Sequence, residues 1–160
     1  MMKKIFFILL LTAFTMSMNA QLTVDKLMDK YKGMPHAEYV NVPKMMMNLA
    51  KTVGGPDIQE ANEYMKCIHS VKVLDMEDCS PSVKKQFADD VKQLKLDGYE
   101  EMVRVSEDGE QTLILTKGDE KIIREMLIVD ASKEDATIVM LKGKMKQSDM
   151  EKIIKDQTKN

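Results

Sequence analysis

The chain of 160 residues has no tryptophan and contains only two cysteines, two histidines and four prolines. Two cysteines are too few for a fold held together by a disulfide framework. The sequence also lacks a Gly-x-Ser-x-Gly elbow, a glycine-rich phosphate loop and a His-Glu-x-x-His motif. These patterns mark several hydrolase, nucleotide-binding and zinc-protease classes. We therefore predict no catalytic residue and no cofactor from local motifs.

Long hydrophobic runs and a charge excess of one sign are absent after residue 20. The net charge is -2, and it becomes -4 without Lys3 and Lys4. Charges of both signs are scattered, which is not the basic footprint of a nucleic-acid-binding surface. No apolar run after residue 20 is long enough to span a membrane. We expect residues 21–160 to form one domain, since there is no internal repeat, low-complexity tract or linker.

The first twenty residues have the three parts of a secretory signal peptide. Lys3 and Lys4 precede an apolar run over residues 5–11, and the small residue Ala20 marks a cleavage site. The alternative is a permanent membrane anchor, which needs about 20 apolar residues, more than this run has. We predict that residues 1–20 are a removed signal peptide and that the mature chain is exported, either periplasmic or secreted.

The apolar periodicity and the turn residues predict an α+β fold with a single antiparallel β-sheet and helices packed mainly on one face. Glu107-Asp108-Gly109 is typical of a tight hairpin turn, and short connections favour antiparallel neighbours. The strand order is not determined by these patterns. The predicted helices cover residues 23–31, 43–53, 56–68 and 81–97, with a last one from 148, and the predicted strands cover residues 37–42, 70–76, 99–106, 110–117, 121–130 and 136–142.

Four segments of the chain resemble one known family. They are residues 39–42 before a Met-rich helix, residues 70–74, residues 98–102, and residues 141–143 before the last helix. Together they are similar to exported proteins of Bacteroidetes-type bacteria that are grouped as domain of unknown function 4252. The resemblance covers nearly all of the mature chain. It implies a location in the cell envelope and supplies no catalytic residue.

Methionine is unusually frequent, with sixteen in the chain and twelve after residue 20. Met45, Met46 and Met47 lie in the predicted helix 43–53, where Met46 aligns with Leu49 on the stripe expected to be buried. Thioethers bind Cu(I), but consecutive helix residues point about 100° apart, so these three cannot converge on one ion. We favour adaptable core packing or a partner-docking surface for the three methionines.

The two cysteines, Cys67 and Cys79, could be bridged in an oxidising compartment or could be free redox or structural thiols. The strand predicted between them would hold them apart, because a strand rises about 3.3 Å per residue. Free thiols are therefore favoured. Cys67, His69 and Cys79 match no standard zinc spacing, and the only other histidine is His36, so no metal site is predicted.

The predicted function is a non-enzymatic envelope or periplasmic protein that binds an unidentified envelope protein partner or regulates a surface system. The alternative is a periplasmic binder of Cu(I) or of a small apolar ligand through Met and Cys side chains. An enzyme is disfavoured, because adjacent acidic residues such as Asp89-Asp90 and Glu100-Glu101 point apart on a helix or strand. A solvated face is expected for these acidic pairs.

Overall fold

The computed structural model describes residues 21–53 and 66–149, with no side-chain account of residues 50–53. The sheet has six strands, all paired antiparallel, which confirms the predicted α+β class with a single antiparallel sheet. In chain order the elements are α2 (Val24–Tyr31), β1 (Glu38–Val42), α3 (Lys44–Val53), β2 (Ile68–Asp75), α5 (Pro81–Lys92), β3 (Glu100–Glu107), β4 (Glu110–Gly118), β5 (Ile122–Ala131) and β6 (Ala136–Lys146).

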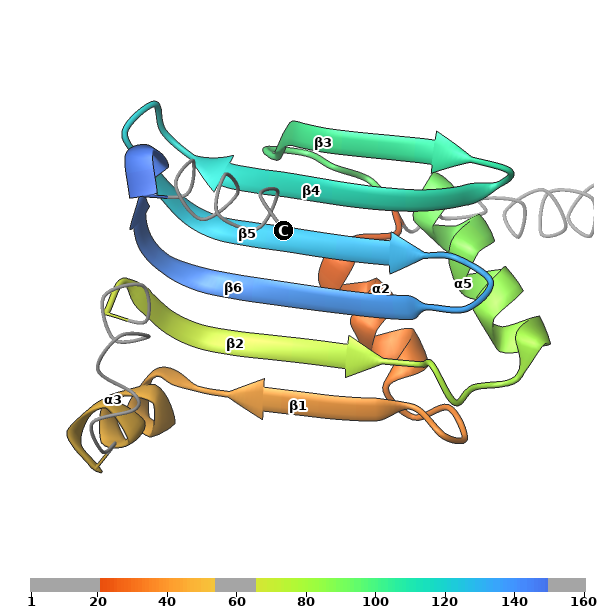
Figure 1. The fold of residues 1–160 in the computed structure, drawn as a ribbon, viewed down its shortest axis with the longest axis horizontal. Coiled ribbons are helices and arrows are strands. Elements are labelled where there is room, and N and C mark those ends of the chain that lie inside the picture. The colour runs from red at the N-terminus through yellow and green to blue at the C-terminus, as the bar shows by residue number, and fades with distance from the viewer. Residues whose placement is uncertain (1–20, 54–65, 150–160) are drawn as a thin grey trace, which may run out of the picture.

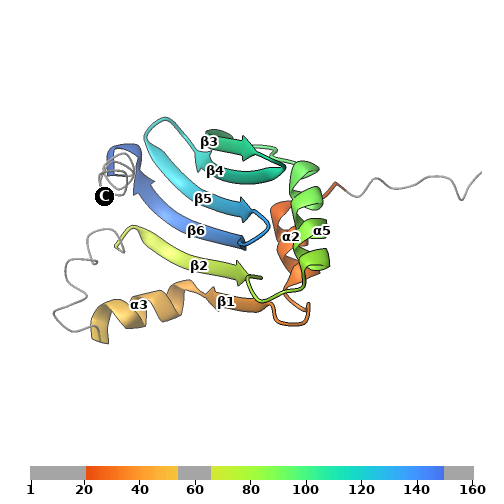
Figure 2. The same ribbon diagram turned by 45° about the vertical axis from the view of Figure 1, so that its right-hand side comes forward.

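The strand order is β1-β2-β6-β5-β4-β3, as Figure 1 shows. Strands β3 to β6 form a meander because short turns join them. The β3–β4 turn has Asp108 at φ 49° and Gly109 at φ 85°, so the Asp-Gly pair adopts the left-handed backbone that was predicted for a tight hairpin. The antiparallel pair β1–β2 joins the sheet beside β6, on the side away from β5, and α3, which follows β1, lies at one corner of the sheet (Figure 2).

Helices α2 and α5 lie behind the sheet in Figure 1 and pack with it around the main hydrophobic core. Tyr31 of α2 meets Phe87 of α5 edge to face, with ring centroids 5.3 Å apart. The Tyr31 hydroxyl donates a hydrogen bond of 2.8 Å to Asp90, which also pairs with Lys30. Asp90 is therefore a mostly buried link between the two helices, and the expectation of a solvated face was wrong for this residue.

The centre of the sheet is apolar on both faces. Met126 and Leu127 are consecutive in β5 and both are buried, so they point to opposite faces. Leu127 belongs to the main core, whereas Met126 forms a second, smaller cluster with Ile123 and Met145. Within the described residues, none of the helices is both long enough and apolar enough to cross a membrane.

Element boundaries differ from the sequence prediction by two residues or more at three places. Strand β2 begins at Ile68, which was placed on the stripe of the helix predicted for residues 56–68; residues 56–65 of that predicted helix lie outside the described residues. Strand β6 continues to Lys146, four residues beyond the prediction, because Gly143 lets it pass close to the backbone of Cys67. Helix α5 ends at Lys92, before the buried Leu94. Of the last predicted helix, only residues up to 149 are described.

Candidate functional site

Helix α3 exposes an apolar stripe to solvent. Met45 is 78% exposed, Met46 is 52% exposed and Leu49 is 59% exposed, while Met47 is buried at 4%. The prediction that Met46 and Leu49 lie on the buried stripe was therefore wrong. Among residues 44–49 of this helix the buried position is Met47, one residue further on, and the helix contacts β2.

The three exposed side chains are neighbours on one side of the helix. Met45 and Leu49 are four residues apart and Met46 and Leu49 three apart, which are the spacings at which helical side chains meet. We call Met45, Met46 and Leu49 the α3 surface. Met47 points away from it into the protein, so the three consecutive thioethers do not converge, and Leu49 replaces Met47 in the candidate docking set.

The α3 surface belongs to a basic helix. Its sequence contains Lys44 and Lys51 and no acidic residue. A helix that is apolar on its exposed side and positive in net charge suits a partner surface with an apolar centre and acidic surroundings. This charge pattern is the feature of α3 that indicates the chemistry of a partner.

The cysteines lie at opposite ends of β2. Cys67 directly precedes the strand and is half-buried, while Cys79 follows it and is buried; the two do not form a disulfide. Cys79 donates its S–H to the carbonyl of Pro35 at 3.3 Å. Burial raises the pKa of the Cys79 thiol, which keeps it protonated and disfavours redox or nucleophilic chemistry there. Among residues 21–53 and 66–149, no group of three His, Cys, Asp or Glu side chains could hold a metal.

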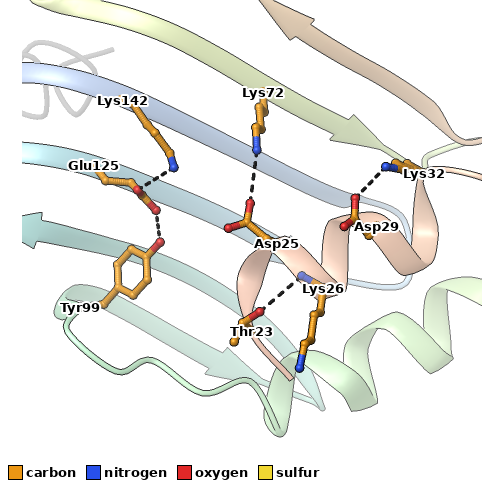
Figure 3. A network of polar contacts seen from close by, with 9 residues as sticks. All are labelled: Thr23, Asp25, Lys26, Asp29, Lys32, Lys72, Tyr99, Glu125 and Lys142. Carbon is orange, nitrogen blue, oxygen red and sulfur yellow. Dashed lines mark hydrogen bonds and ion pairs between the residues drawn. The ribbon is translucent and has the colours of Figure 1, made fainter. Parts of the chain in front are cut away.

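A row of charged side chains crosses the helix-side face of the sheet. Lys117 of β4 lies opposite Glu125 of β5, which lies opposite Lys142 of β6. Lys142 Nζ is 3.2 Å from Glu125 Oε2, and the hydroxyl of Tyr99 donates to the other oxygen of the same carboxylate (Figure 3). Lys117 Nζ lies 5.4 Å from the centre of the Tyr99 ring. The row thus binds the segment before β3 onto the sheet.

The hydroxyl of Tyr99 in this row has a shifted pKa. Burial first, and then the hydrogen bond to Glu125, raise the pKa of Tyr99 well above its usual value. The phenol of Tyr99 is therefore the neutral hydrogen-bond donor to the Glu125 carboxylate near neutral pH. The arrangement holds a mostly buried carboxylate between two donors, which is a structural role.

The remaining contacts in Figure 3 surround α2. Lys72 of β2 pairs with Asp25 at 3.2 Å, and Lys32 pairs with Asp29 at 2.7 Å. The hydrogen bond of Lys32 lowers the pKa of Asp29. These pairs lie at the surface, where an ion pair contributes about 0–1 kcal/mol.

Sequence reasoning assigned no site role to Tyr99, Glu125 or Lys142. A signal was present for Glu125, because it alternates with Leu127 and Val129 in β5 and must share their face. A carboxylate on the core side of a strand requires a partner. Which side chain supplies that partner depends on the strand order, which the sequence left undetermined.

Comparison with known proteins adds one finding to this geometry. Residues 31–153 match the family described as Domain of unknown function (DUF4252). The chain belongs to this family. The matched region contains the α3 surface, both cysteines and the charged row. No curated protein and no solved structure matches the chain.

Proposed function

We propose that the mature chain is a non-enzymatic protein-interaction module that acts outside the cytoplasm, in the cell envelope or after secretion. The observation that carries the proposal is the α3 surface, on which three large apolar side chains are more than half exposed on adjacent helical positions. Single exposed apolar residues are ordinary, but a contiguous group of them is typical of interaction sites.

The α3 surface is presented on a fixed helix. Met47 is buried and α3 contacts β2, so the helix is attached to the sheet on one side while Met45, Met46 and Leu49 point outward. Methionine is flexible and polarisable, and it fits partner surfaces of irregular shape. The partner we infer is a protein groove with an apolar floor and acidic side chains around it, because α3 contributes only positive charge.

The location part of the proposal is supported by sequence alone. Lys3 and Lys4, the apolar run and Ala20 are the features that a translocation system and its peptidase read. Mass measurement of the chain recovered from cells should give an N-terminus at or near Gln21 and a cell-envelope or extracellular fraction. A chain that begins at Met1 and fractionates with the cytosol would contradict this part of the proposal.

Site-specific photocrosslinking in cells tests the binding part. A photoreactive residue at position 45 should give one adduct of defined mass. The same residue at the exposed Ser106 of β3, at the opposite edge of the sheet from β1, serves as the control. Leu49→Glu should remove the adduct, because it places an acid against the acidic rim of the partner, while thermal unfolding stays unchanged at this exposed position. Leu49→Lys should reduce the adduct less.

Two results would overturn the docking assignment. One is an adduct pattern at position 45 that matches the control and does not respond to Leu49→Glu. The other is binding of the purified chain to vesicles of phosphatidylglycerol that depends on Met45, Met46 and Leu49, since that would make the α3 surface a membrane contact in place of a protein contact.

A further inference from the structure

A groove of about 530 Å³ lies between α5 and the turns that join β3 to β4 and β5 to β6. One wall is a single face of α5, formed by residues that recur three or four positions apart from Pro81 to Lys92. The other wall is formed by residues 108–110 and 131–133. The volume falls within the range of small-molecule sites, and the helix wall is about 17 Å long by helical rise. Helix α5, which forms this wall, lies at the opposite end of the sheet from α3 (Figure 2).

The interior of the groove is apolar. Ala131 is buried at its base, Ala88 packs against the main core, and Pro81 lies at the start of α5. The lysines on the helix wall add aliphatic stems, which can cover an apolar ligand while their ammonium groups remain in water. The groove can therefore enclose a hydrocarbon body.

The four lysines that line the groove differ in their partners. Lys92 pairs with Asp89 at 3.3 Å, and Lys133 lies 4.0 Å from Glu110. Lys84 donates to the backbone carbonyl of Glu134, a neutral acceptor, at 2.9 Å.

Within residues 21–53 and 66–149, neither Lys84 nor Lys85 forms an ion pair with a carboxylate. Both lie on the face of α5 that lines the groove. Asp108, on the opposite wall, is the acid that would oppose an anion.

We propose that this groove binds an amphipathic anion, with its carboxylate at Lys84 and Lys85 and its alkyl chain along Ala88 and Ala131. The two ammonium groups beside the apolar groove would bind the charged head of such a ligand, and the groove would hold its hydrocarbon body. The site shares no residue with the α3 surface, so it does not depend on the proposed docking function.

Titration with monomeric dodecanoate, followed by amide chemical shifts of the labelled chain as purified from cells, tests this site. Saturable shifts should be confined to residues 81–92, 108–110 and 131–133. Lys84→Gln with Lys85→Gln should weaken binding about tenfold, the effect of losing a charge-assisted contact, while Lys144→Gln, an exposed lysine of β6, should not. Asp108→Asn should strengthen binding, since it removes the opposing charge.

A larger side chain that fills the groove provides a second test, which does not rely on charge. Ala88→Leu should reduce the affinity for dodecanoate while the amide spectrum of the rest of the chain stays unchanged. The proposal is overturned if neutral dodecyl maltoside produces the same shifts with the same affinity, or if the lysine pair and Lys144→Gln have equal effects. Binding to phosphatidylglycerol vesicles without any binding of monomeric dodecanoate would also overturn it.

Discussion

Replacing Gly143 with alanine should destabilise the fold strongly, because β6 approaches another backbone at this residue. A Cβ at Gly143 would lie 2.0 Å from the carbonyl oxygen of Cys67 and 3.0 Å from the Cα of Ile68. Cβ atoms essentially never approach other atoms closer than 3.0 Å, so β6 would have to move by about 1 Å. That movement would break the 2.8 Å hydrogen bond from Lys144 N to Cys67 O.

The magnitude follows from these two effects. Forcing an extra methyl group into a packed site costs about 1–3 kcal/mol, and a lost hydrogen bond costs about 0.5–1.5 kcal/mol. We expect Gly143→Ala to reduce the free energy of unfolding by about 2–4 kcal/mol. In urea this lowers the unfolding midpoint by about 1–2 M with an unchanged slope.

Gly33→Ala is the matched control, because nothing lies within 4 Å of a Cβ built at Gly33. Its free energy of unfolding should change by less than about 1 kcal/mol. Equal unfolding midpoints for the two alanine variants would refute the close approach of β6 to Cys67. It would also remove our explanation for the extension of β6 beyond the predicted strand.

Three further perturbations test other parts of the structure. Tyr31→Phe should reduce the free energy of unfolding by about 1–2 kcal/mol, because the hydrogen bond to Asp90 is lost. A double-mutant cycle with Asp90→Asn, measured by urea unfolding, should show positive coupling between the two substitutions. Additive effects would contradict the link between α2 and α5. Hydrogen bonds from two backbone N–H groups lower the pKa of Asp119 in the folded chain below its ordinary value of 3.8. The ionised Asp119 side chain therefore stabilises the fold above pH 3.8, and this contribution is lost as the pH falls through the lowered pKa of the folded state. The stability gap between the unmodified chain and Asp119→Ala should therefore close in acid, and a gap that stays constant with pH would disprove this. Cys79 should react with a thiol reagent about tenfold or more slowly than Cys67, measured by mass spectrometry of native protein, and equal rates would contradict its burial and raised pKa.

Local patterns in the sequence were sufficient for the elements and the fold class. Short turns such as Asp108-Gly109 require antiparallel neighbours, because no parallel crossover fits so few residues. The periodicity over residues 23–31 likewise predicted α2 to within one residue. These features depend on residues close in the chain, and so a single sequence contains them.

The candidate sites depended on contacts between distant residues. Helical periodicity groups Met46 with Leu49, but it does not say which face of the helix meets the sheet, and Met47 is as apolar as its neighbours. Only the packing of α3 beside β2 decided that Met47 is buried and that Met45, Met46 and Leu49 are exposed.

The sequence by itself thus determined most of the described helices and strands and the antiparallel pairing from β3 to β6, because helical hydrogen bonding and turn geometry are local. The tertiary structure decided the strand order, and with it the row that joins Lys117, Glu125 and Lys142. It also decided the groove beside α5, whose two walls come from segments about 20–50 residues apart. Contacts between such distant segments depend on how the whole chain buries its apolar side chains, and this cannot be predicted from a short stretch of sequence.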